Sequence, residues 1–255
     1  MPVSIEAGSA GLRLDDGWPE RWRVEWRSGR ESRFCSVREL ALAPMVSVDP
    51  VRGFSWNRNQ RHRPGLQYMV STGRLHGAES MQEARLLLAL DFAGDVLDVV
   101  SQPLKLVFGA ADGERSHTPD YLAVTRQGVW LIDVRPERLI KPVDLEKFAA
   151  AAETSLTCGW RYTVAARWRE HVPAALDAIS SQRRALSDPL GLRPILLDLI
   201  RDGRRRFGEA AAASGCEPVA RAQLLNLLWQ RALGVDLSEP LGDRSMLVPA
   251  SGGML

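Results

Sequence analysis

Two apolar segments separated by a short turn constrain the fold more than any other feature of the sequence. Residues 117–125 (HTPDYLAVT) and 129–136 (VWLIDVRP) are rich in the β-branched and aromatic residues that favour strands. The three residues between them, 126–128, read Arg-Gln-Gly and are typical of a tight turn. The sequence therefore predicts an antiparallel hairpin, around which the rest of the chain must be arranged.

The charged residues of this hairpin gather at its open end. With Gln127-Gly128 at the centre of the turn, Asp120 faces Arg135 and Leu122 faces Asp133. Because side chains alternate along a strand, Asp120, Asp133 and Arg135 then share one face, although a slip of one residue would move Asp120 to the other. Two carboxylates held so close repel each other unless a cation lies between them. A divalent metal ion such as Mg²⁺ prefers carboxylate oxygens.

Helix and strand patterns alternate on both sides of the hairpin. Helices are predicted for residues 79–92 and 144–160, the second ending at Gly159. The predicted strands are residues 65–73, 95–109 (broken at Pro103) and 161–168, together with a hairpin over 22–40 that turns at Ser28-Gly29 and shows Trp22, Val24 and Trp26 on one face.

The character of the chain changes near residue 173. Residues 192–207 and 219–233 have the apolar spacing of amphipathic helices, and residues 241–249 are typical of a short strand. We therefore expect two domains, an α/β domain over residues 1–172 and a helical domain over residues 173–255.

Composition excludes several classes of protein. None of the apolar runs in these 255 residues approaches the ~18 residues of a membrane-spanning helix. The first residues lack the pattern of a secretion signal. The three cysteines, Cys35, Cys158 and Cys216, are too few and too far apart for a disulfide framework or a zinc knuckle. We expect a cytoplasmic protein, associated with the nucleoid when it is bound to DNA.

Charge is unevenly distributed although the net charge is only +2. Residues 51–78 hold five arginines and no acidic residue, whereas residues 79–153 hold 13 acidic and 8 basic residues. A basic segment before an acidic centre is typical of a phosphate-binding surface around a metal site. The alternative is ordinary clustering of surface charge. The candidate DNA contacts in this segment are Arg52, Arg58, Arg61, Arg63 and Arg74.

A third carboxylate is available upstream of the hairpin. Glu79 and Glu83 lie four residues apart, on one side of the predicted helix, and either can lean towards Asp120 and Asp133. The alternative is a solvated helix face beside two aspartates that only end their strands.

These residues resemble a known family. A helix with a glutamate, a Pro-Asp pair and a strand ending in Asp-x-Arg are similar to the PD-(D/E)xK nuclease core. More narrowly, residues 71–92, 95–103, 117–124, 129–136 and 224–247 resemble the TnsA-like endonuclease subunits of heteromeric transposases. The resemblance implies a restriction-endonuclease-like mixed β-sheet flanked by helices, followed by a C-terminal winged-helix-like domain that binds partner subunits.

The resemblance also implies roles for individual residues. Glu83, Asp120 and Asp133 would bind Mg²⁺, for which Mn²⁺ can substitute. Separately from the resemblance, His117 lies two residues before the Pro-Asp pair, where it can contact a DNA phosphate or support the metal site; the alternative is a structural histidine. Arg135 occupies the position of the usual lysine. Because an arginine stays protonated, we expect it to stabilise charge on the phosphate and not to transfer a proton. Lys141 is a weaker candidate for that cation.

The function implied is hydrolysis of phosphodiester bonds at transposon ends by a metal-dependent DNA endonuclease subunit. Its implied partners are double-stranded DNA, an integrase-type transposase subunit and an ATPase regulator, with further DNA contacts from Arg204–Arg206. The replacement of lysine by arginine keeps a second hypothesis open, a degenerate nuclease fold that binds DNA and transposase partners without cutting. A third hypothesis is a free-standing nuclease with the same chemistry and no partners.

Overall fold

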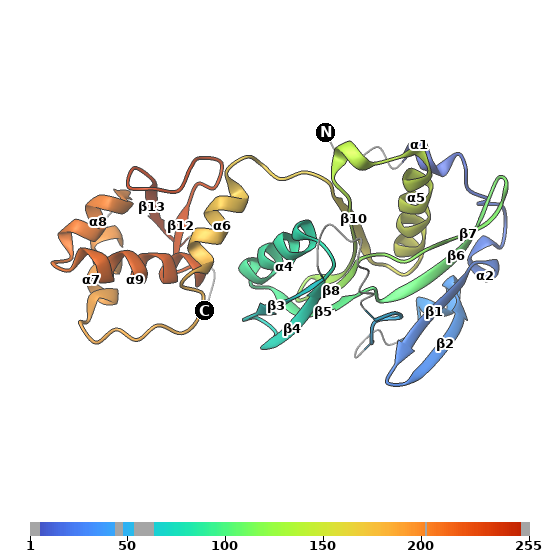
Figure 1. Ribbon diagram of the computed structural model, residues 1–255, viewed down its shortest axis with the longest axis horizontal. Helices are drawn as coiled ribbons and strands as arrows, with labels where there is room; N and C mark the ends of the chain where they lie inside the picture. The colour runs from blue at the N-terminus through green and yellow to red at the C-terminus, as the bar shows by residue number, and fades with distance from the viewer. Residues whose placement is uncertain (1–5, 44–47, 54–63, 202, 251–255) are drawn as a thin grey trace. The chain divides into compact units, whose positions relative to one another are not determined.

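The computed structural model is an α/β structure that divides into two compact units, Met1–Arg167 and Trp168–Leu255 (Figure 1). It describes residues 6–43, 48–53, 64–201 and 203–250. The predicted boundary after residue 172 falls within helix α6 (Val172–Ser180), which lies entirely in the second unit. None of the helices in the described part of the chain combines the length and apolar character needed to cross a membrane.

A four-stranded mixed sheet carries the predicted hairpin. Its strands, in spatial order, are β10 (Arg161–Ala165), β9 (Gly128–Val134), β8 (Tyr121–Thr125) and β5 (Val96–Ser101). Neighbouring strands are antiparallel except β9 and β10, which are parallel because helix α5 (Pro142–Thr157) carries the chain back across the sheet between them. The predicted hairpin, the helix after it and the strand that follows are all confirmed.

A second sheet of four strands is antiparallel throughout. Its spatial order is β2 (Glu31–Ser36), β1 (Arg23–Ser28), β6 (Leu104–Ala110) and β7 (Gly113–His117). The β1–β2 hairpin was predicted, and Trp22, Val24 and Trp26 are buried on one side as expected. The segment 95–109 is two strands, as its break at Pro103 indicates, and the two belong to different sheets.

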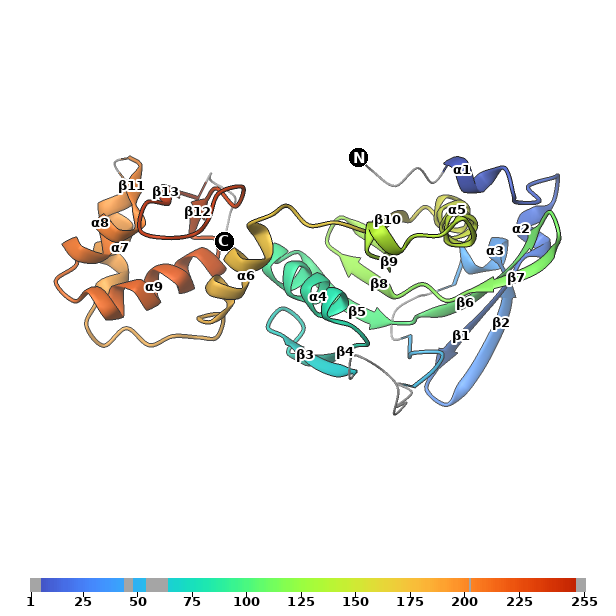
Figure 2. The same ribbon diagram turned by 45° about the horizontal axis from the view of Figure 1, so that its top comes forward.

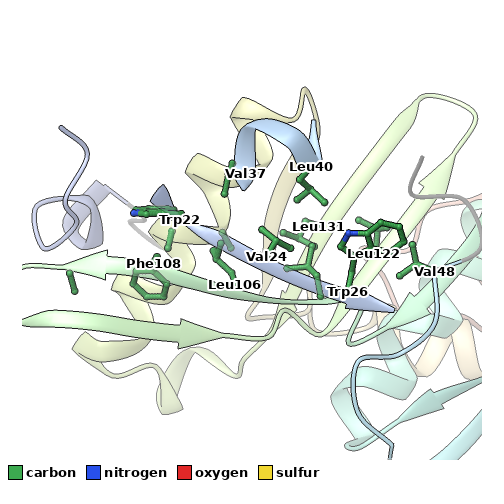
Figure 3. Close-up of a cluster of buried hydrophobic side chains, with 14 residues drawn as sticks. Trp22, Val24, Trp26, Val37, Leu40, Val48, Leu106, Phe108, Leu122 and Leu131 are labelled. Carbon is green, nitrogen blue, oxygen red and sulfur yellow. The ribbon is translucent and has the colours of Figure 1, made fainter. Parts of the chain in front are cut away.

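The two sheets and α5 share one hydrophobic core (Figure 3). It combines Val24 and Leu106 from the second sheet, Leu122 and Leu131 from the first, and the small face of α5 at residues 150–151. Full burial of each such leucine contributes about 1.5–3 kcal/mol, so this core holds the sheets and the helix in a fixed arrangement. Helix α5 packs against strands of both sheets (Figure 2). Side chains at the ends of β7, β9 and β10 are thereby held together.

Helix α4 (Met81–Ala93) is the predicted helix of residues 79–92 and packs against a hairpin of β3 (Gly65–Met69) and β4 (Arg74–Ala78). The hydroxyl of Ser80 accepts from the N–H of Glu83 and begins the helix. The buried Asp91 carboxylate accepts from the N–H groups of Val70 and Ser71, at 2.9 and 2.8 Å, and holds the hairpin turn on the helix. Only β3 was predicted. The remaining short elements of this unit are α1 (Glu6–Ser9), α2 (Trp18–Arg21), α3 (Val37–Leu40) and a 3₁₀ turn η1 (Glu137–Leu139).

The C-terminal unit is mostly helical, with a small sheet. After α6 come α7 (Leu192–Arg201), β11 (Arg205–Arg206), α8 (Phe207–Ala213), α9 (Glu217–Trp229), β12 (Leu233–Val235) and β13 (Met246–Pro249). The three strands pair in the order β11-β13-β12. The sequence patterns predicted α7, α9 and β13, but α7 ends at Arg201 and β11 occupies part of the predicted helix of residues 192–207. The elements α6, α8 and β12 were not predicted.

Candidate active site

The hairpin that carries the aspartates has a different register from the one predicted. Leu122 pairs with Leu131, and Thr125 pairs with Gly128, so the predicted pairs of Asp120 with Arg135 and of Leu122 with Asp133 are wrong. The Thr125 hydroxyl donates to the Gly128 carbonyl at 2.9 Å and accepts from the N–H of residue 127 at 3.1 Å, which centres the turn one residue earlier. Leu122 pairs with residue 131 and not with residue 133, so the register differs by two residues. Because side chains alternate with a period of two, Asp120, Asp133 and Arg135 remain on the strand face that was predicted for them.

Asp120 and Asp133 lie across from each other, one step beyond the last paired residues of β8 and β9. Asp133 is only 2% exposed. The Asp120 carboxylate accepts from the N–H of Val134 at 2.6 Å. Burial and then the negative charge of Asp133 raise the pKa of Asp120 well above its usual range, with Glu83 adding to the effect. The two aspartates thus form a site of concentrated negative charge.

Two donors hold the Asp133 carboxylate. The Tyr162 hydroxyl on β10 donates to Oδ2 at 2.7 Å. The Nε2 atom of His117, at the end of β7, lies 3.0 Å from each carboxylate oxygen. His117 therefore supports an aspartate of the site, and its ring also packs edge-on against Phe148 of α5.

Glu83 lies in the first turn of α4, whereas Glu79 precedes the helix and forms an ion pair with Arg52 at 3.2 Å. Glu83 accepts from the N–H of Glu79 and the hydroxyl of Ser80, both at 2.8 Å, and from the hydroxyl of Tyr121 at 3.3 Å. Burial raises the pKa of the Glu83 carboxyl. Of the two glutamates that the sequence left open, Glu83 acts more strongly on Asp120.

The predicted register paired Arg135 with Asp120, and the observed strand pairing does not bring these two residues together. Its Nε lies 3.5 Å from the Asp144 carboxylate at the start of α5, and its side chain is 41% exposed. That Nε atom is buried and makes no hydrogen bond within the described structure. Lys141 ends the preceding loop, and its N–H donates to the same Asp144 carboxylate at 3.0 Å. The Arg135 guanidinium and the backbone of Lys141 therefore lie near Asp144.

The predicted DNA-contacting arginines are only partly described. Arg58, Arg61 and Arg63 lie outside the described residues. Arg52 and Arg74 are largely exposed, and they pair with Glu79 and Asp98 respectively. Both guanidinium groups therefore lie on the surface, each held by a single carboxylate.

The residues fit a divalent cation in their donor chemistry. All three candidate ligands, Asp120, Asp133 and Glu83, offer carboxylate oxygens, and the repulsion that raises the pKa of Asp120 is what a cation would relieve. They do not form a closed cage, because no three His, Cys, Asp or Glu side chains among the described residues lie close enough together to hold a metal ion. The fit is to the aspartate pair, and Glu83 must move to join it.

Two further residues lie at the site: Tyr162, which was not singled out from the sequence, and Gln102, which was named only as part of the segment 95–103 that resembles the family. Tyr162 belongs to a strand that reaches the site only through the α5 crossover, and its spacing from Asp133 carries no signal. Gln102 is buried in the left-handed region (φ 49°), and its N–H donates to the carbonyl of Asp120 at 2.7 Å. Its side-chain oxygen is buried and has no hydrogen-bond partner among the residues that the structure describes. A glutamine between β5 and a proline was the only signal for it.

Comparison with known proteins does not identify a family. Neither a scan against protein-family models nor a search of curated proteins yields a match to this chain. The function must therefore be argued from the residues and geometry of the site.

Proposed function

We propose that this chain is a metal-dependent DNA endonuclease, the subunit of a heteromeric transposase that hydrolyses phosphodiester bonds at transposon ends. The observation that carries the proposal is the pair of Asp120 and Asp133, at which burial, the Asp133 charge and the Glu83 charge raise the pKa of Asp120. Such an arrangement opposes folding stability and is typical of a functional site. The mixed sheet between α4 and α5 supports the expected restriction-endonuclease-like fold.

In this proposal Asp120 and Asp133 hold Mg²⁺, or Mn²⁺ in its place, with Glu83 as the third ligand. The cation would supply Lewis-acid activation of the scissile phosphate and of the attacking water. Arg135 is exposed enough to turn from Asp144 to a phosphate oxygen, where its permanent charge offsets the charge that develops during hydrolysis. His117 acts through Asp133 and does not need to contact DNA.

The surface arginines would bind the DNA backbone in this proposal. Arg52 and Arg74 offer exposed guanidinium groups, and contacts to phosphates position a protein on DNA without selecting a sequence. Recognition of the transposon ends then falls to an integrase-type transposase subunit. The order of elements in the C-terminal unit, from α7 to β13, supports a winged-helix-like domain that binds an ATPase regulator.

A second candidate function is a scaffold that keeps the nuclease fold and binds DNA and partners without cutting. Two observations favour it. Among the described residues no three side chains are poised to hold a metal ion, and an arginine occupies the position of the usual lysine.

Calorimetric titration of Mn²⁺ into the full chain, with a short DNA duplex present, separates the two. For the nuclease we expect saturable binding that Asp120→Ala abolishes. Asp112→Ala is the matched control, because Asp112 is an exposed aspartate paired with Arg115 in the β6–β7 turn. It should bind as the wild type does. No binding by the wild-type chain would overturn the nuclease proposal in favour of the scaffold.

A further inference from the structure

Asp133 is held more firmly than the aspartate opposite it. Its carboxylate is contacted by the Tyr162 hydroxyl at 2.7 Å and by His117 Nε2 at 3.0 Å. Asp120 accepts from the Val134 N–H at 2.6 Å. The two groups that contact Asp133 come from β10, which pairs with β9, and from the end of β7, which belongs to the other sheet, so they hold the carboxylate from two separate elements.

Tyr162 is placed by the parallel pairing of β9 and β10. Tyr162 pairs with Leu131, and Val164 pairs with Asp133. The phenol therefore extends two residues along β9 to reach the Asp133 carboxylate. Burial and the neighbouring Asp133 charge raise the pKa of the Tyr162 phenol well above its usual range. The phenol therefore stays protonated and remains a donor.

A donor of this kind has a definite effect at a metal site. A hydrogen bond to one oxygen of a carboxylate leaves the remaining lone pairs pointing in a fixed direction. It also offsets part of the repulsion between Asp133 and Asp120, so the pair is held ready for a cation. Tyr162 is distant from both aspartates in the sequence. It contacts Asp133 because α5 leads the chain from β9 to β10, which pairs beside β9.

We propose that Tyr162 is a positioning residue that orients the Asp133 carboxylate towards the divalent cation, with His117 as the second support. This inference rests on the proposed function, because it assigns Tyr162 a role at the metal site. Tyr162 itself contacts neither the cation nor the DNA in this proposal.

The test is the Mn²⁺ affinity of Tyr162→Phe, measured by calorimetry on the full chain. Removing such a support should weaken binding by about 10–100-fold. Thr163→Val is the matched control, because it removes a hydroxyl from the neighbouring residue of β10, which points to the other face of the sheet. It should leave the affinity unchanged. Binding by the wild type that Tyr162→Phe does not weaken would overturn this inference alone. No binding by the wild type would overturn the proposed function, and this inference with it.

A second readout distinguishes orientation from a general structural role. If Tyr162 acts through Asp133, adding Tyr162→Phe to Asp133→Asn should not weaken the remaining Mn²⁺ affinity further. A loss as large as that in the wild-type background would overturn the proposal.

A third readout needs no variant and therefore remains valid if Tyr162→Phe fails to fold. Binding of Mn²⁺ withdraws charge from the carboxylate that Tyr162 contacts, so saturation of the wild-type chain should produce a tyrosine difference signal in near-ultraviolet absorbance. Saturation without that signal would overturn the proposal.

Discussion

In the C-terminal unit a buried amide meets neutral backbone groups and one arginine, whereas in the N-terminal unit buried carboxylates meet one another. The Asn226 side chain on α9 donates to the carbonyls of Gln182 and Arg184, at 2.6 and 2.9 Å. Its oxygen accepts from Arg193 at 2.7 Å. These bonds hold the segment between α6 and α7 against α9, and both polar atoms of the Asn226 amide are paired with groups of complementary chemistry.

The carboxylates of the N-terminal unit are arranged differently. The described groups that act most on Asp120 after burial are the Asp133, Glu83 and Glu79 carboxylates and the Val134 N–H. Three of these four raise its pKa and so oppose its ionisation. A paired polar group in a core needs no explanation beyond stability. Buried like charges do need one, and the bound cation of the proposed function would provide it.

The largest change in the free energy of unfolding is expected at Asn226, whose buried side chain both donates and accepts hydrogen bonds. Asn226→Ala leaves two carbonyls without this donor and removes one of the two acceptors of Arg193, so it should lower the free energy of unfolding of the C-terminal unit by about 3 kcal/mol. Urea denaturation followed by tryptophan fluorescence measures this loss. Gln230→Ala removes an exposed partner of the same arginine and should cost less than about 1 kcal/mol. Equal costs would contradict the structural role of Asn226.

Removing a carboxylate charge at the candidate site should stabilise the fold, whereas Asn226→Ala should destabilise it. The raised pKa values of Asp120 and Glu83 mean that the folded state binds protons more tightly than the unfolded state. Without metal, the free energy of unfolding should therefore fall as pH rises above the ordinary carboxyl pKa values of 3.8 and 4.5. Asp120→Asn should flatten this fall and raise the midpoint of thermal unfolding by roughly 2–4 °C at neutral pH in the presence of a chelator.

In excess Mn²⁺ the wild-type chain should unfold at a higher temperature than Asp120→Asn, the reverse of the order expected in chelator. The cation stabilises the wild-type chain by binding the folded state, whereas Asp120→Asn has lost a ligand. Asp112→Asn is the control, because Asp112 is exposed and its pKa is lowered by Arg115. It should not raise the midpoint at neutral pH. If Asp120→Asn also fails to raise it in chelator, the carboxylates are not in repulsion.

The elements around the site could be predicted because their local signals agree with the fold. Alternation in β8 and β9 and the apolar spacing of α4 each predicted the correct element. The end of α5 is marked by Gly159 (φ 69°), and the N–H of Trp160 donates back to the carbonyl of Ser155 at 2.8 Å. These signals are contained in a few consecutive residues.

The register and the supports of the site could not be predicted in the same way. The turn is centred by a hydrogen bond of the Thr125 hydroxyl, and the sequence allows that bond or the alternative turn equally well. Tyr162 reaches Asp133 only after the chain has crossed the sheet through α5. His117 reaches it from a strand of the other sheet. Such contacts depend on packing between elements that are distant in sequence, and no local pattern encodes them.

The smallest effect on stability is expected at the exposed charges. Arg52 pairs with Glu79 at the surface, so Arg52→Gln should change the free energy of unfolding by less than about 1 kcal/mol. If Arg52 binds a DNA phosphate, the same change should reduce the slope of log affinity against log salt concentration by about 1. Fluorescence anisotropy with a labelled duplex at several salt concentrations measures this slope.

Arg38→Gln is the matched control, because Arg38 is an exposed arginine paired with Glu20, and the exposed guanidinium is lost in the same way. It should leave the salt dependence unchanged. Equal slopes for wild type and Arg52→Gln would remove Arg52 from the DNA surface. An exposed ion pair contributes little to stability. If replacing Arg52 changes the salt dependence of DNA binding but not the free energy of unfolding, its role is to bind DNA and not to stabilise the fold. Asp120 satisfies the same criterion by a different measure, since its raised pKa means that the fold is more stable when this carboxyl group is uncharged.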